Sequence, residues 1–95
     1  MYLMISTYLA PLDEVDKSRA DHSAYLDELE ERGFVVAAGR QDPPAGGVIL
    51  FDVDSEAEAL ELIAGDPYVQ RGLAEYRPVG WQPARGALRN WTRKR

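Results

Sequence analysis

The chain has 95 residues, 45% of them hydrophobic, which suffices for one compact domain with a small core. It contains no cysteine, so disulfide bonds, thiolate nucleophiles, iron–sulfur clusters and cysteine-rich zinc sites are excluded. The formal net charge of −5 conceals an asymmetry, because residues 1–84 hold all 16 acidic side chains but only six of the 11 basic ones. The negative charge of this body argues against nucleic acid as its partner.

The opening segment MYLMISTYLA lacks the basic start of a signal peptide, and Ser6 and Thr7 interrupt its apolar run. We therefore expect a cytoplasmic protein with no membrane partner. Aromatic and aliphatic residues from Tyr2 to Leu9 predict a strand that Pro11 ends.

A long helix is predicted over Asp13 to Arg32, because this segment is charged and free of proline and glycine, and Gly33 follows as its C-terminal cap. Residues 34–40 (FVVAAGR) predict a second strand. A Pro/Gly-rich connection at 41–47 leads to a third strand, GVILFDVD, so these two strands are expected to be antiparallel neighbours.

A second helix is predicted to begin at Ser55, which forms a capping box with Glu58, and to run up to Gly65. Asp66 and Pro67 predict a further short helical turn, with Asp66 as its N-cap. The last strand is LAEYRPVGW, where Pro78 indicates an edge or a bulge.

The resulting order, β-α-β-β-α-β, is that of an α+β, ferredoxin-like fold whose antiparallel sheet has both helices on one face. A chain of this length cannot cover the other sheet face, and its strands look apolar on both sides. We therefore predict a homodimer that packs through the sheet. Residues 1–83 are expected to form the domain, and residues 84–95 a basic C-terminal tail.

The tail, ARGALRNWTRKR, carries five basic residues around Trp91. Three readings stay open: docking on an acidic surface of this protein or a partner, disorder, or contact with phosphates.

His22 is the only histidine, and helical spacing places it on one face with Val15, Ser18, Leu26 and Leu29, so it turns inward. One interpretation is a packed histidine satisfied by backbone groups. The other is a general acid/base whose tautomer is fixed by a carboxylate, for which Asp66 is the candidate. A metal site is not expected from one imidazole and scattered carboxylates.

Other motifs are less specific. Serines 6, 18 and 23 lack the context of a nucleophile, and AAGRQDPPAGG has neither the spacing nor the setting of a nucleotide-binding loop. Arg40 beside Gly39 could present a guanidinium to a carboxylate or phosphate, or form a surface ion pair.

Four segments, YLAPLDEVD, HSAYLDELEERGFVVAAG, GGVILF and DPYVQRGLAEYRPVGW, resemble in order and spacing the YCII-related (YciI-like) proteins of the dimeric α+β barrel superfamily. The most specific parts are the DPYVxxGL segment and the helix-borne histidine. The resemblance covers residues 2 to 82 and implies a ferredoxin-like fold that dimerises through its sheet. It also implies a His/Asp active site, which corresponds here to His22 and Asp66.

This chain departs from the family pattern after the second strand, where Gly39-Arg40 replaces a Gly-Pro pair. An arginine at that edge is compatible with an anionic substrate, or with a surface position that has changed without a role in binding. The tail also lies outside the pattern.

Together these features predict a cofactor-independent enzyme that transfers a proton on a small cyclic or aromatic-derived substrate, with lyase, dehydrohalogenase or isomerase chemistry. His22 and Asp66 are the predicted catalytic pair, and Tyr8, Gly39, Arg40 and Tyr68 are predicted to line the substrate pocket. The alternative is a non-catalytic ligand-binding or regulatory module of the same fold.

Overall fold

The computed structural model describes residues 1–95, which form four strands and four helices. In chain order these are β1 (Tyr2–Tyr8), α1 (Leu12–Asp16), α2 (Arg19–Glu31), β2 (Val35–Arg40), β3 (Gly47–Phe51), α3 (Glu56–Ala64), α4 (Pro67–Gln70) and β4 (Ala74–Gly80).

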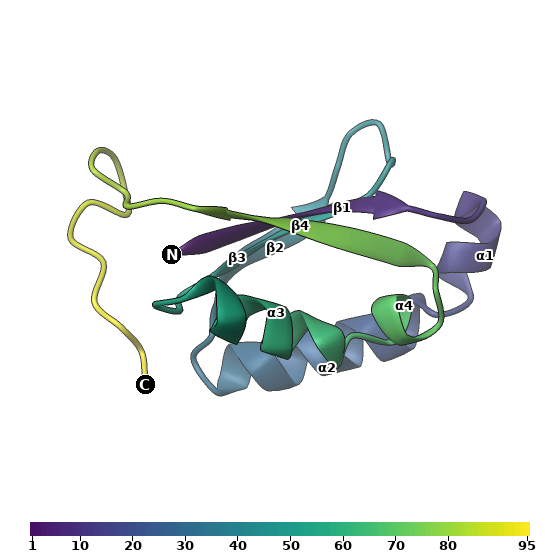
Figure 1. Cartoon of the computed structure of the whole chain (residues 1–95), viewed down its shortest axis with the longest axis horizontal. Helices are drawn as coiled ribbons and strands as arrows, with labels where there is room; N and C mark the ends of the chain where they lie inside the picture. Colours follow the sequence, from purple (N-terminus) through teal and green to yellow (C-terminus); the bar gives the residue numbers. More distant parts are fainter.

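The strands form one antiparallel sheet in the order β2-β3-β1-β4, which is the ferredoxin-like topology predicted from the sequence. Helices α2, α3 and α4 lie against one face of this sheet, and α1 lies beyond its end (Figure 1). β4 pairs only with β1 and is therefore an edge strand, which explains how Pro78 is tolerated in it.

The prediction of one continuous helix over Asp13 to Arg32 was wrong, because the chain turns at Lys17 and Ser18 between α1 and α2. Ser18 is buried there, and its hydroxyl accepts a hydrogen bond from Arg71 at 2.9 Å. Serine competes with helical hydrogen bonding through its side chain, and here a partner from α4's C-terminal end holds it in the turn. The break sets the start of α2 beside α4.

The core lies between the sheet and the helices. Alternate strand residues Met4, Ile49 and Phe51 pack there against Leu29 of α2 and Ile63 of α3. All five are almost completely buried. The period of two along each strand thus places one apolar row against the helices.

Local signals mark the helix ends as predicted. Ser55 accepts a hydrogen bond from the Glu58 amide at 3.1 Å and caps α3. Gly33 has a φ of +85°, the left-handed conformation that lets the chain leave α2 and enter β2 without strain.

The second face of the sheet carries no helix. Register pairs Leu3 with Leu50 and Ile5 with Val48, and their side chains alternate with the core row, so they point to this helix-free face. Leu50 is buried there, whereas Leu3, Ile5 and Val48 are partly exposed. Val79 of β4 continues the row beside Leu3.

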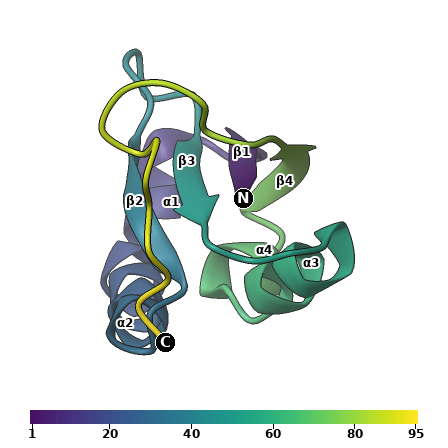
Figure 2. The same ribbon diagram turned by 90° about the vertical axis from the view of Figure 1, so that its left-hand side faces the viewer.

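The basic tail packs on the protein's own acidic residues. Trp91 Nε1 donates a hydrogen bond to Asp52 at 2.9 Å, and Arg93 pairs with Asp52 and Asp54 at 3.2 and 2.7 Å. Arg95 ends over the Phe34 ring at 4.1 Å. Figure 2 shows the tail arching over the sheet and descending past β2 to the end of α2.

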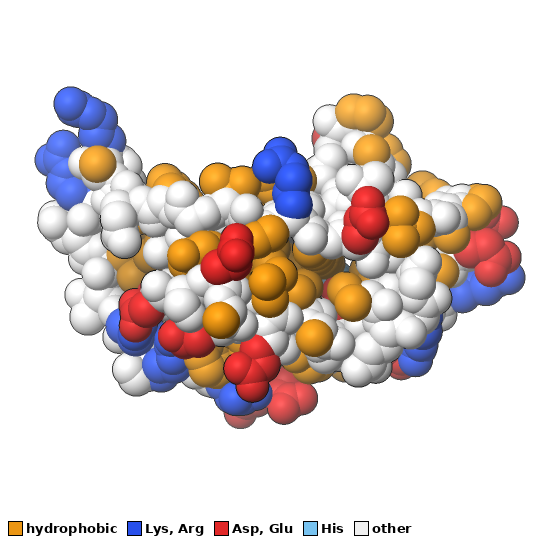
Figure 3. Space-filling model, viewed as in Figure 1, with side chains coloured by type: hydrophobic (Ala, Val, Ile, Leu, Met, Phe, Trp, Pro, Cys, Tyr) orange, Lys and Arg blue, Asp and Glu red, His pale blue; other side chains and the backbone are white.

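Basic side chains gather over the loop after β4, at the end of the molecule opposite α1 (Figure 3). None of the helices is both long and apolar enough to cross a bilayer.

Candidate functional site

His22 and Asp66, 44 positions apart in the chain, are in direct contact in the structure. His22 Nδ1 lies 2.7 Å from Asp66 Oδ1, the distance of a strong charge-assisted hydrogen bond. An ionised aspartate can only accept, so the hydrogen bond is Nδ1–H donating to the carboxylate. The other ring nitrogen, Nε2, is then the one available to a ligand.

Asp66 is completely buried, and three donors surround its carboxylate. Besides His22, the Tyr68 amide donates to Oδ1 at 3.1 Å, which is the N-cap interaction predicted for the start of α4. The Tyr76 hydroxyl donates to Oδ2 at 3.1 Å. The two interpretations of Asp66 are therefore compatible, because one carboxylate caps α4 and also holds the imidazole.

Tyr68 forms a wall against the imidazole. Its ring stacks on His22 with the centroids 4.0 Å apart and the planes 6° from parallel. Tyr8 in turn meets Tyr68 edge to face at 6.0 Å. With Nδ1 bound to Asp66 and one ring face covered, the orientation of His22 is fixed from two directions.

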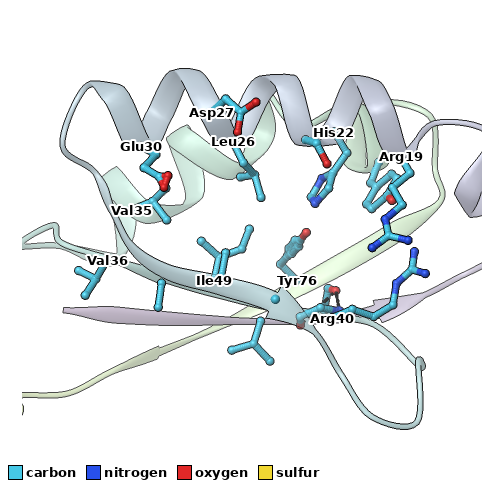
Figure 4. Close-up of a pocket in the computed structure, with 18 of the residues that line it drawn as sticks. Arg19, His22, Leu26, Asp27, Glu30, Val35, Val36, Arg40, Ile49 and Tyr76 are labelled. Carbon is cyan, nitrogen blue, oxygen red and sulfur yellow. Dashed lines mark hydrogen bonds between the residues drawn. The ribbon is translucent and has the colours of Figure 1, made fainter. Parts of the chain in front are cut away.

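A cavity of about 290 Å³ opens between α2 and the β2-β3-β1 side of the sheet. In Figure 4, His22 and Leu26 point from α2 toward the sheet, and Ile49 and Tyr76 come from the opposite side. The side chain of His22 is 16% exposed, so the ring is accessible from the cavity but largely shielded from solvent. The remaining lining includes Tyr8, Val35, Ala38, Gly39, Arg40 and Tyr68.

Arg40 stands at one end of this cavity. Its Nε donates to the Tyr8 hydroxyl at 3.0 Å, and one Nη lies 2.5 Å from Asp16 of α1. The Asp16 contact is the surface ion pair that the sequence left open as one reading of this arginine. Because Arg40 also lines the cavity, the pair does not remove it from the site.

Burial raises the pKa of the Tyr76 hydroxyl far above its ordinary value, and the negative charge of Asp66 raises it further. Burial likewise raises the pKa of Tyr68, and the neighbouring Tyr8 adds to the effect. Both phenols therefore stay protonated near neutral pH, and Tyr76 remains a hydrogen-bond donor to Asp66.

The structure brings all six predicted site residues together: five line the cavity, and Asp66 lies behind His22. Sequence reasoning missed Arg19 and Tyr76. Arg19 lies one helical turn before His22, so helix geometry could have found it. Tyr76 had no local signal, because only strand pairing brings it beside Asp66.

No group of three or more His, Asp or Glu side chains is arranged to hold a metal ion. The donors around His22 are instead arranged for hydrogen bonding.

The model of the YCII-related domain matches residues 1–82, and the tail lies outside the match. A comparison with curated proteins found no significant match. A similar solved structure is that of the 5-chloro-2-hydroxyhydroquinone dehydrochlorinase TftG from Burkholderia phenoliruptrix, with a TM-score of 0.69 and 21% identity. The similarity covers 86% of this chain and 94% of that one, and it shows a shared fold.

Proposed function

The chain belongs to the YCII-related family, and from this membership and the geometry around His22 we propose that it is a small cytoplasmic, cofactor-independent enzyme. In this proposal His22 and Asp66 transfer a proton on a small cyclic substrate. The observation that carries it is the 2.7 Å contact between His22 Nδ1 and a fully buried Asp66 at the wall of a cavity.

His22 is proposed to act as the base through Nε2. Histidine is the side chain whose ordinary pKa suits proton uptake and release near neutral pH. The bond to Asp66 fixes the tautomer with Nε2 unprotonated and stabilises the imidazolium that forms when Nε2 takes the proton. Tyr76 and the Tyr68 amide hold Asp66 in place, so little reorganisation is needed during the transfer.

The reaction class is proposed with support from the structural neighbour. That protein is named a dehydrochlorinase, and its structure is a complex with 2,5-dihydroxybenzoquinone. In such an elimination a base takes a proton from carbon, the freed electron pair forms a double bond, and chloride leaves. His22 could supply the same proton step in a lyase, a dehydrohalogenase or an isomerase.

We also propose that the protein is a homodimer that buries the uncovered sheet face. The row formed by Leu3, Ile5, Val48, Leu50 and Val79 is apolar, and no helix covers it. Leu50 is buried in a single copy, but the other four residues stay partly exposed. Size-exclusion chromatography with light scattering tests this part: a mass near twice 10.6 kDa is expected. A monomer at micromolar concentration would refute the dimer and leave the His22 chemistry standing.

The catalytic proposal is tested by screening halogenated and hydroxylated ring compounds for halide release and for solvent deuterium uptake. His22→Asn is the informative variant, since its amide can still donate to Asp66 but cannot carry the proton. We expect kcat to fall about 10²–10⁴-fold. Glu31→Gln, on the exposed side of α2, serves as the matched control.

Unchanged turnover in a correctly folded His22→Asn protein would refute the mechanism. Binding of ring compounds without any turnover in the native protein would favour the alternative function, a ligand-binding module on the same fold.

A further inference from the structure

The cavity beside His22 has positively charged side chains at one end and negatively charged side chains toward the other. Arg19 and Arg40 stand at one end, and Asp27 and Glu30 lie toward the other, with His22 between them (Figure 4). Arg19 and Glu30 are 11 residues apart on α2, which corresponds to roughly 16 Å along the helix axis. A ligand in this cavity therefore experiences opposite charges at its two ends.

The basic end is built from two different elements. Arg40 comes from the end of β2 and Arg19 from the first residue of α2, and their guanidinium groups point toward one another in Figure 4. Arg40 is held by Tyr8 and Asp16 and is only 21% exposed, whereas Arg19 takes part in no ion pair. Two facing cations repel each other, and an anion between them relieves that repulsion.

The charge at this end suits one negative charge. Asp16 neutralises part of the positive charge of the arginine pair, which leaves a net excess of about one positive charge. Guanidinium groups match the planar, two-oxygen geometry of a carboxylate. At the far end, Asp27 and Glu30 would repel a second anionic group but can accept hydrogen bonds from hydroxyls.

The size and walls of the cavity suit a single ring. A cavity of roughly 150 Å³ can hold benzene, so about 290 Å³ leaves space for ring substituents. The walls between the charged ends are apolar or aromatic and include Leu26, Ile49 and Tyr8.

We propose that the cavity binds a monoanionic ring acid, with its carboxylate between Arg19 and Arg40 and a neutral, hydroxyl-bearing edge toward Asp27 and Glu30. The ring then lies against Leu26 and Ile49, and its central carbons come within reach of His22. That the ring is also the substrate rests on the function proposed above; the binding of the carboxylate does not.

Calorimetric titration of the full chain with 4-hydroxybenzoate and with its neutral analogue 4-hydroxybenzamide tests the proposal. Arg40→Gln is expected to weaken 4-hydroxybenzoate binding about tenfold. Arg19→Gln, which breaks no side-chain hydrogen bond or ion pair within the protein, should weaken it about threefold. Neither variant should change binding of the amide. Arg85→Gln, an exposed arginine of the tail that does not line the cavity, is the matched control and should bind the acid normally.

A second pair of probes reports on the acidic end and on the kind of anion. Benzene-1,4-dicarboxylate should bind more weakly than 4-hydroxybenzoate and should gain affinity in Glu30→Gln. The proposal is overturned if the native protein does not bind 4-hydroxybenzoate at millimolar concentration, or if Arg19→Gln and Arg40→Gln bind it normally. Tighter binding of phenyl phosphate than of 4-hydroxybenzoate would also overturn the assignment to a carboxylate.

His22→Asn separates this proposal from the catalytic one. The variant should still bind 4-hydroxybenzoate within about threefold of the native affinity, because it keeps both arginines. Loss of turnover with retained, arginine-dependent binding supports both proposals. Normal binding in the arginine variants, together with lost turnover in His22→Asn, refutes only the anion site.

Discussion

Asp66 and Asp52 are both buried carboxylates that accept a hydrogen bond from a ring N–H, yet the two rings differ in chemistry. Asp66 faces the imidazole of His22, a side-chain type that can act as a general acid or base. Asp52 faces the indole of Trp91, which cannot, and an arginine that is always charged.

The two carboxylates also lie beside different cavities. His22 lines the cavity of about 290 Å³ between α2 and the sheet, while Asp52 lines a smaller one of about 200 Å³, where the tail closes over the end of β3. Burial of Asp52 opposes its ionisation, but hydrogen bonds from Trp91 and Arg93 outweigh it and hold the pKa of Asp52 below its ordinary value. Asp52 is bound by an indole and a guanidinium, neither of which can act as a base, whereas Asp66 is bound by an imidazole, which can.

The largest expected difference between the two sites is in activity. Asp66→Asn keeps the shape of the side chain but removes the charge that stabilises protonated His22, so kcat is expected to fall about 10²–10⁴-fold. Asp52→Asn should leave kcat unchanged and reduce only stability. Steady-state kinetics on a ring compound found by the screen measure kcat for both variants. Equal losses of kcat would contradict the proposed difference between Asp66 and Asp52.

Removing the tail should affect stability alone. Deletion of residues 84–95 removes the hydrogen bonds of Trp91 and Arg93 to Asp52, the pairing of Arg93 with Asp54 and the contact of Arg95 with Phe34. The free energy of unfolding is expected to fall by about 2 kcal/mol, because Asp52 loses both of its side-chain hydrogen-bond donors. Urea titration measures the change. A parallel loss of 4-hydroxybenzoate binding would show that the tail supports the cavity after all.

A smaller effect is expected from Tyr76→Phe, which leaves Asp66 one donor short. The remaining donors still hold the carboxylate, so kcat should fall about fivefold while KM changes little. Tyr2→Phe, a tyrosine at the other end of the sheet, is the control. A change confined to KM would place Tyr76 in ligand binding instead of in the positioning of Asp66.

The smallest effect is a pH dependence of the tail's contribution to the free energy of unfolding. Hydrogen bonds from Arg93 lower the pKa of Asp54, and hydrogen bonds from Trp91 and Arg93 lower the pKa of Asp52. Because both folded-state values lie below the ordinary 3.8, the stabilisation is complete above that pH and is lost as the pH falls through the folded-state values. The stability gap between the full chain and the deletion should therefore be wider at about pH 6 than at about pH 3. An unchanged or wider gap in acid would contradict this linkage.

Local rules predicted much of this molecule because they act over a few residues. The cap at Ser55, the left-handed Gly33 and the edge position of Pro78 each follow from one residue and its neighbours. The break at Ser18 was missed because it depends on a contact that is not local. Its stabilising partner, Arg71, comes from a segment 53 positions away.

The inward face of α2 and the N-cap role of Asp66 were determined by the sequence itself, since helical spacing and the Asp-Pro pair depend on nothing distant. Tertiary structure alone decided that His22 and Asp66 touch, that Tyr76 completes the carboxylate's partners, and that Arg19 and Arg40 share one end of a cavity. Each of these contacts joins elements far apart in the chain. Their positions depend on strand pairing and on how the helices pack against the sheet, and neither can be read from a single segment.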